Sequence, residues 1–131
     1  MSEHREGQGR PVQTVLVVDD DVAQADALAM LLQLEGFGIE IATSGPQALF
    51  RAGKTRPDAI VMDIGMPGMS GIQVARELAS RGYQTGVRLI ALTGYGDDID
   101  RLATSQAGFE FHLSKPVDVM ALLEALRHPL M

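Results

Sequence analysis

Five short apolar segments alternate with five stretches of helical periodicity along this chain, and this alternation limits its fold more than any other feature. The apolar segments lie at 15–18, 39–41, 59–62, 89–92 and 109–113. Such alternation is typical of parallel βα units, in which helices cover both faces of one sheet. With 131 residues and 46% hydrophobic content, the sequence predicts one α/β domain with one real core.

The helices expected between these segments carry start and stop signals. The first has apolar residues at helical spacing and Gly36 as a stop, and Ser44 with Gln47 and Ser70 with Gln73 have capping-box spacing at the second and third. The fourth is short and weakly apolar, and the fifth has a clear apolar stripe. The expected ranges are 22–35, from 44, from 70, 98–106 and 118–127.

The composition of the apolar segments suggests their order in the sheet. Segments 15–18, 59–62 and 89–92 are continuously apolar, as expected of central strands buried on both faces. Segments 39–41 and 109–113 are interrupted by polar residues, which is typical of edge strands. We therefore predict a doubly wound, five-stranded parallel sheet in the order 2-1-3-4-5, with the first and third strands adjacent at the topological switch point.

Acidic residues stand where two of the central strands end. Asp19, Asp20 and Asp21 follow the first strand, and Asp63 follows the third, so these carboxylates are expected to converge at one rim. Their repulsion is most simply relieved by a hard divalent cation, Mg²⁺ or Mn²⁺. Asp21 and Gln24 have the spacing of an N-cap pair, which leaves Asp21 out of the metal site.

The same rim is expected to receive a hydroxyl and an ammonium group. A carboxylate placed like Asp63 can act as a nucleophile on phosphorus and form an aspartyl phosphate. Lys115 can neutralise phosphoryl oxygens, and Thr93 can donate a hydrogen bond beside it. Taken singly, each has a plainer explanation, namely a solvated turn, a strand end or a surface lysine. The joint pattern favours a phosphoryl site.

Four motifs in the chain carry a family resemblance. The runs VLVVDDD at 15–21, DIGMPGMSG at 63–71, ALTG at 91–94 and LSKP at 113–116 resemble the receiver domains of two-component response regulators. The resemblance covers about residues 13–127, in order and with the family's spacing. It implies a flavodoxin-like (βα)5 domain, either as a single-domain regulator or as part of a larger protein such as a hybrid histidine kinase. Residues 1–11 carry glycine, proline and charged residues without apolar periodicity, so we expect a flexible tail there and the domain at 12–131.

The resemblance also implies a role for each site residue. Asp63 would be the phosphoacceptor for a phosphohistidine on a histidine kinase or a histidine phosphotransfer protein. Mg²⁺ would be bound by Asp20, Asp63 and the backbone carbonyl of Gly65, with Asp19 acting through a water. Lys115 and Thr93 would contact the phosphoryl group, and the peptide bond between Lys115 and Pro116 would be cis.

Two residues depart from what many members of the family carry. His112 stands three residues before the lysine, where Tyr or Phe often serves as a rotating switch. It is either a muted switch or an edge-strand side chain that faces solvent. Tyr95 stands two positions after Thr93. In the family this position helps to set how easily water reaches the phosphoryl group. With the small Gly65 opposite it, as the resemblance implies, we expect Tyr95 to cover the phosphoryl group partly and lengthen its lifetime.

The implied function is a phosphoacceptor switch rather than a turnover enzyme, with at most self-catalysed phosphorylation and dephosphorylation. Phosphorylation would change the surface formed by the helix at 98–106, the strand at 109–113 and the helix at 118–127. One alternative is a degenerate receiver that acts only as a docking module. Another is a phosphatase of the haloacid dehalogenase type, in which Asp19 and Asp21 would act but Asp63 has no role and Ala23 does not fit.

Composition excludes several other classes of function. The absence of cysteine excludes disulfides and thiolate-ligated metals. A net charge of −6 argues against direct nucleic-acid binding, because phosphate contacts need clustered Lys and Arg. The apolar runs are strand-sized and residues 2–10 are polar, so neither a membrane span nor a signal peptide is expected, and a cytoplasmic location follows by default.

Overall fold

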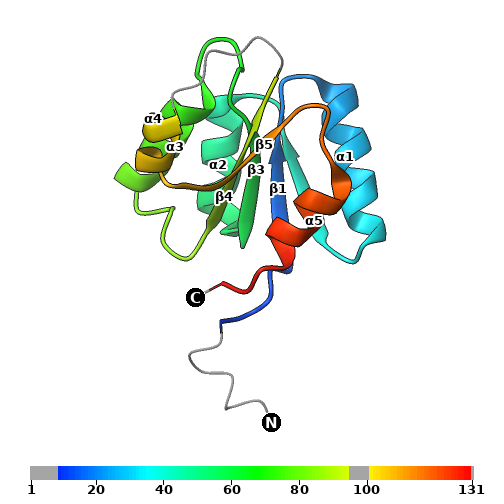
Figure 1. Cartoon of the computed structure of the whole chain (residues 1–131). Coiled ribbons are helices and arrows are strands. Elements are labelled where there is room, and N and C mark those ends of the chain that lie inside the picture. The colour runs from blue at the N-terminus through cyan, green and yellow to red at the C-terminus, as the bar shows by residue number, and fades with distance from the viewer. Residues whose placement is uncertain (1–8, 95–100, 131) are drawn as a thin grey trace.

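A computed structural model describes residues 9–94 and 101–130 (Figure 1). Strands and helices alternate throughout this part of the chain. The strands are β1 (Thr14–Val18), β2 (Gly38–Ala42), β3 (Ala59–Asp63), β4 (Arg88–Thr93) and β5 (Phe109–Ser114). The helices are α1 (Val22–Leu34), α2 (Gly45–Thr55), α3 (Gly71–Ser80), α4 (Arg101–Ala107) and α5 (Val119–Arg127). Residues 98–100, where the fourth helix was expected to begin, lie outside the described residues.

The strands form one parallel sheet in the order β2-β1-β3-β4-β5, which confirms the predicted topology. Strands β3 and β4 are buried along their whole length and β1 is buried after its first residue, whereas β2 and β5 are partly exposed at the edges. This division follows the sequence, because only the continuously apolar segments can be covered on both faces.

Helices cover both faces of the sheet (Figure 1). A layer of buried hydrophobic residues lies on each face. One contains the buried faces of α1 and α5 together with alternate residues of the central strands. The other contains the buried residues of α2 and α3 and the end of α4. Helices on both faces leave the carboxyl ends of the strands as the open rim where a ligand can reach the sheet.

Side-chain caps define where most helices begin. Asp21 caps α1 as predicted, because its side chain accepts a hydrogen bond from the backbone N–H of Gln24. Ser70 forms the predicted capping box with its glutamine partner at the start of α3. Only one of the two hydrogen bonds of the capping box predicted at Ser44 is present: the Ser44 side chain accepts from the backbone N–H of Gln47. The Gln47 side chain accepts from the backbone N–H of Thr43 and not from that of Ser44, so the second half of the prediction is wrong.

The two ends of the described chain are paired with each other. Arg10, which was expected to lie in the flexible tail at 1–11, exchanges two backbone hydrogen bonds of 2.8 Å with Leu130. Its guanidinium also lies 2.7 Å from a carboxylate oxygen of Asp58, just before β3. The chain is thus anchored to the domain two residues before the expected boundary at residue 12. In the described ranges, no helix is long and apolar enough to cross a bilayer.

Asp58 is expected to make stability depend on pH. Burial raises the pKa of Asp58, but hydrogen bonds from Arg10 and from the N–H groups of Gln13 and Thr14 outweigh it and hold this pKa below the usual 3.8. The ionised Asp58 carboxylate therefore stabilises the fold fully at pH values above 3.8, the ordinary pKa. This stabilisation is lost as the pH falls through the lower pKa of the folded state. Chemical denaturation of Asp58→Asn should show a loss of stability at pH 7 that shrinks as the pH falls below 3.8 and disappears below the folded-state pKa. A loss independent of pH would contradict this assignment.

Candidate functional site

The pairing of the strands brings their polar ends to one rim. Strands β1 and β3 pair in register, so Asp19, the residue after β1, lies beside Asp63, the last residue of β3. Thr93 ends β4, and it pairs with the last residue of β5, so Lys115 follows directly. The parallel register therefore brings these four residues to one rim of the sheet, as predicted.

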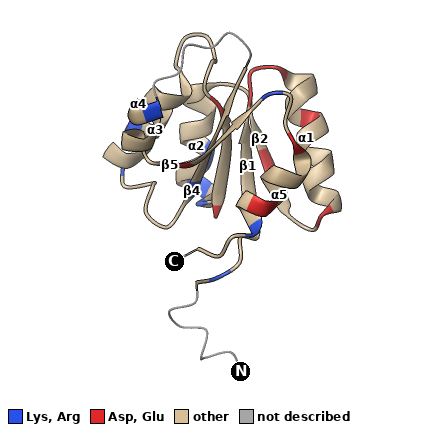
Figure 2. Ribbon diagram, in the orientation of Figure 1, with Lys and Arg blue, Asp and Glu red and all other residues tan. Residues whose placement is uncertain are grey.

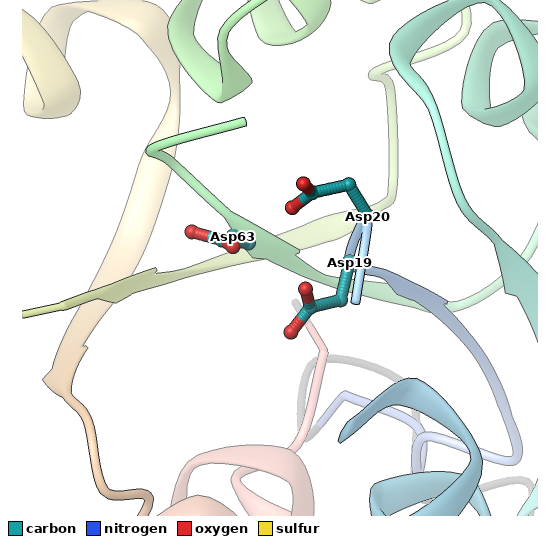
Figure 3. Close-up of side chains that lie close together, drawn as sticks. All are labelled: Asp19, Asp20 and Asp63. Atoms are coloured by element: carbon teal, nitrogen blue, oxygen red, sulfur yellow. The ribbon is translucent and has the colours of Figure 1, made fainter. Parts of the chain in front are cut away.

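Three carboxylates cluster at this rim. One oxygen each of Asp19, Asp20 and Asp63 lies within 4.8 Å of the others (Figure 3). Asp19 and Asp63 are buried, whereas Asp20 is exposed. Burial raises the pKa of Asp19 and the charge of Asp63 adds to this, while the N–H of Asp21 and the ammonium of Lys115 oppose it. Clustered carboxylates open to solvent on one side fit the hard oxygen-ligated cations, Mg²⁺ or Mn²⁺.

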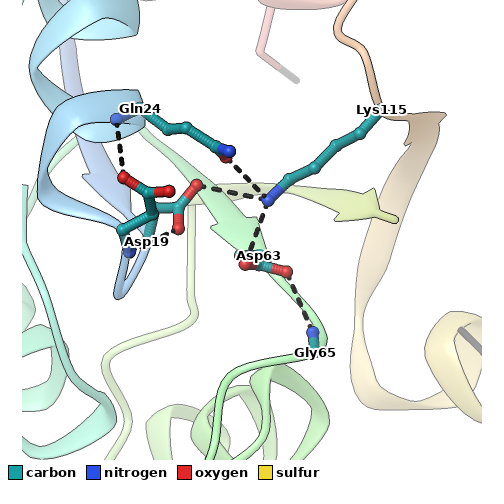
Figure 4. Close-up of polar contacts among 6 residues, drawn as sticks. Asp19, Gln24, Asp63, Gly65 and Lys115 are labelled. Carbon is teal, nitrogen blue, oxygen red and sulfur yellow. Dashed lines mark hydrogen bonds and ion pairs between the residues drawn. The ribbon is translucent and has the colours of Figure 1, made fainter. Parts of the chain in front are cut away.

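Lys115 contacts two of the three carboxylates, those of Asp19 and Asp63. Its Nζ is 3.1 Å from Oδ2 of Asp63, 3.3 Å from Oδ2 of Asp19 and 3.2 Å from Oε1 of Gln24 (Figure 4). Burial lowers the pKa of Lys115, but the contacts with Asp63 and Asp19 outweigh it and raise this pKa above 10.5. The lysine therefore carries its positive charge at any physiological pH.

Asp63 is held from both sides. One carboxylate oxygen accepts a hydrogen bond of 3.0 Å from the backbone N–H of Gly65, and the other contacts Lys115. The loop that follows closes through a 3.1 Å hydrogen bond from the N–H of Gly71 to the carbonyl of Ile64. A Cβ at Gly71 would lie 2.9 Å from the Ile64 Cα, so the close turn requires glycine there.

Thr93 makes a contact that the sequence did not predict. Thr93 is buried, and its hydroxyl oxygen lies 3.3 Å from Nε2 of His112 on β5. Burial, together with the charge of Arg101, lowers the pKa of His112, which favours the neutral ring. The side chain of His112 is half-buried and contacts Thr93, and its role as a switch stays a prediction. Tyr95 lies outside the described residues.

Gln24 is the member of the site that the sequence pattern did not indicate. Its backbone N–H serves the expected cap at Asp21, but its side chain reaches Lys115, 91 residues away in sequence. The only available signal was its position in the first turn of the helix that follows the acidic run. The peptide bond between Lys115 and Pro116 is cis, as the resemblance implied.

Comparison with known proteins gives related sequences over almost the whole chain. Residues 15–127 match the family model of the response regulator receiver domain. The probable transcriptional regulatory protein TcrX of Mycobacterium tuberculosis is 37% identical over 123 residues, covering 94% of this chain and 51% of that protein. The sensory transduction protein RegX3 of Mycobacterium bovis is 33% identical over 114 residues, covering 87% and 49%. The chain spans about half the length of these curated relatives.

Solved structures show the same architecture. The chemotaxis protein CheY4 of Vibrio cholerae matches with a TM-score of 0.80 at 28% identity, covering 88% of this chain and 96% of that one. A chain in the co-crystal structure of the Saccharomyces cerevisiae histidine phosphotransfer signaling protein Ypd1 and the receiver domain of its downstream response regulator Ssk1 matches with a TM-score of 0.78. It is 26% identical, and the match covers 89% of this chain and 88% of that one.

Proposed function

Since the chain belongs to the family of response regulator receiver domains, we propose that it accepts a phosphoryl group on Asp63 from a phosphohistidine. The observation that carries this proposal is the setting of Asp63. Its carboxylate ends a buried strand, contacts the Lys115 ammonium at 3.1 Å and shares an acidic cluster with Asp19 and Asp20. Such a site can bring a cation and a phosphoryl group together on one carboxylate.

The proposed transfer is a substitution at phosphorus. A carboxylate oxygen of Asp63 forms the new O–P bond as the P–N bond of the phosphohistidine breaks, and the imidazole nitrogen keeps the electron pair of that bond. Lys115 neutralises charge on the phosphoryl oxygens, and the Thr93 hydroxyl donates to one of them. Such transfer depends mainly on positioning and charge neutralisation.

The proposed metal ligands are the Asp20 and Asp63 carboxylates and the Gly65 carbonyl, with Asp19 acting through a water. When bound, Mg²⁺ would neutralise phosphoryl oxygens and reduce the repulsion among the three carboxylates. The donor set supports this assignment, since every side chain in the cluster offers oxygen and none offers sulfur or imidazole.

The proposed partners are a histidine kinase or a histidine phosphotransfer protein as donor and an output protein or domain. Receiver domains are signalling switches, and we propose that phosphorylation alters the surface of α4, β5 and α5. The contact between Thr93 and His112 supports this, because β5 carries the histidine. Figure 2 shows Lys and Arg on several separate elements. From the net charge we expect no nucleic-acid contact. That absence and the cytoplasmic location stay predictions.

The test is to incubate the protein with Mg²⁺ and a small acyl phosphate and to measure its intact mass. The proposal predicts a gain of one phosphoryl group per chain, which is lost when Mg²⁺ is chelated. A complete lack of adduct would overturn it in favour of the docking-module alternative. Repeated turnover of a generic phosphate ester would instead favour the phosphatase alternative.

Asp20→Ala is expected to weaken Mg²⁺ binding without unfolding the domain. Asp20 is exposed and adds repulsion to the cluster, so the thermal midpoint of the metal-free variant should equal or exceed that of the wild type. Calorimetric Mg²⁺ titration and thermal unfolding measure the two effects. Asp21→Ala is the matched control, since losing this cap should cost about 1 kcal/mol but leave Mg²⁺ affinity unchanged. A lower midpoint for metal-free Asp20→Ala would contradict the repulsion argument.

A further inference from the structure

The Lys115 ammonium has one acceptor for each of its three N–H groups. Two acceptors are the charged carboxylates of Asp63 and Asp19, and the third is the neutral side-chain oxygen of Gln24 at 3.2 Å (Figure 4). An ammonium group donates three hydrogen bonds and accepts none, so this set satisfies it completely. The direction of each N–H is therefore determined by a separate residue.

The backbone holds Gln24 in place for this contact. Asp21 accepts a hydrogen bond of 3.1 Å from the Gln24 N–H, and the Asp21 N–H donates to Asp19 at 2.9 Å. The acidic loop and the first turn of α1 are thus one hydrogen-bonded unit. On the opposite side, the backbone N–H of Lys115 donates to the Thr93 carbonyl at 2.8 Å. Both partners of the Gln24–Lys115 contact are consequently anchored at their backbones.

Lys115 has room to leave this position. A cavity of about 290 Å³ lies between α1 and the segment after β5, and both Gln24 and Lys115 line it. Most of its other lining residues are apolar, including Leu31 and Val119. A lysine side chain has a long flexible stem, so open space beside it allows other rotamers. The Gln24 oxygen is a third acceptor that restricts these rotamers and holds the ammonium beside Asp63 without adding a negative charge.

We propose that Gln24 is a positioning residue for the phosphorylation site and acts through Lys115. It orients the ammonium so that the group stands at Asp63 when the phosphoryl group arrives. A neutral amide is suited to this role. If the third acceptor of the Lys115 ammonium were also a carboxylate, its negative charge would repel the incoming phosphoryl oxygens. This inference rests on the proposed function, since it concerns how readily Asp63 takes up phosphate.

The first test compares the rates of phosphoryl uptake from a small acyl phosphate, followed by intact mass. Gln24→Met keeps the length and helix propensity of the side chain but removes the acceptor, and Gln24→Asn keeps the amide but shortens its reach. Both should slow uptake about three- to tenfold through loss of positioning. Gln33→Met, an exposed position on the same helix, is the matched control and should retain the wild-type rate.

A double-mutant cycle separates positioning of Lys115 from a general structural effect. In a Lys115→Met background, Gln24→Met should have no further effect on uptake. An equal loss in both backgrounds, or a wild-type rate for Gln24→Met alone, would overturn the inference. If wild type itself takes up no phosphate, the proposed function fails instead.

A second measurement does not depend on phosphorylation. In ¹H–¹⁵N NMR spectra, the Lys115 ammonium protons should exchange with water faster in Gln24→Met than in wild type, because one of their three acceptors is gone. Gln33→Met should leave this exchange unchanged. Equal exchange in all three proteins would overturn the inference even where the double mutant reacts too slowly for a rate.

Discussion

Replacement of Asp63 by asparagine is expected to abolish phosphoryl uptake. An amide oxygen is a far weaker nucleophile than a carboxylate, so no aspartyl phosphate can form at this position. The substitution preserves shape, and its side-chain oxygen can still accept from the Gly65 N–H, while Lys115 keeps its contact with Asp19. The variant should therefore fold normally, bind Mg²⁺ more weakly and show no mass increase with the acyl phosphate.

Asp58→Asn is the matched control for this experiment. Asp58 stands just before β3 and is paired with Arg10, so the same chemical change falls at the opposite end of the same strand. Its uptake should equal that of the wild type. Phosphorylation of Asp63→Asn at the wild-type rate would contradict the assignment of Asp63 as phosphoacceptor.

Ile90→Ala is expected to lower the free energy of unfolding by about 2–5 kcal/mol. Ile90 is fully buried on β4 and belongs to the layer between the sheet and helices α1 and α5. Truncation to alanine removes buried methyl groups and leaves a cavity that a central strand cannot close. Urea denaturation followed by circular dichroism measures the loss.

Leu34→Ala is the control for this change in stability. Leu34 is 79% exposed at the end of α1, so the same kind of truncation removes little buried surface. It should change the free energy of unfolding by about 0.5 kcal/mol or less. An equally small effect of Ile90→Ala would mean that β4 is not a central strand of the fold in solution.

The sheet could be predicted because its signals are local. Continuous apolar runs distinguish buried strands from edge strands, and the order of the strands follows from that distinction together with the rules for parallel connections. The positions of Asp63, Thr93 and Lys115 at one rim follow in turn, since each directly ends or follows a strand. A site placed by the topology of the backbone is thus readable from sequence.

Contacts between distant side chains could not be predicted in this way. The contact of Gln24 with Lys115 and that of His112 with Thr93 depend on which rotamer each side chain adopts between two elements. Arg88 is the clearest example. Arg88 is only 3% exposed. A charged residue is rarely buried without partners, so its burial depends on groups that it contacts in the folded chain.

The partners of Arg88 lie at the C-terminal end of α5. Its guanidinium donates to the carbonyls of Ala125, His128 and Pro129 and lies 5.3 Å from the centre of the Phe111 ring. The last carbonyls of a helix have no partners within it, which makes them suitable acceptors for a cation. These acceptors are 37 to 41 residues away from Arg88 in the sequence, so no local pattern around Arg88 predicts the contacts.

Locating the phosphoryl group tests the central claim most directly. The protein is first incubated with Mg²⁺ and the acyl phosphate. Borohydride then reduces an aspartyl phosphate to homoserine and releases phosphate. Peptide mass spectrometry identifies the residue that has been converted to homoserine. We predict homoserine at position 63 and unmodified aspartate at 19, 20 and 21. Homoserine at position 19 with Asp63 unmodified, or no reduced residue in a protein that has taken up phosphate, would contradict the account.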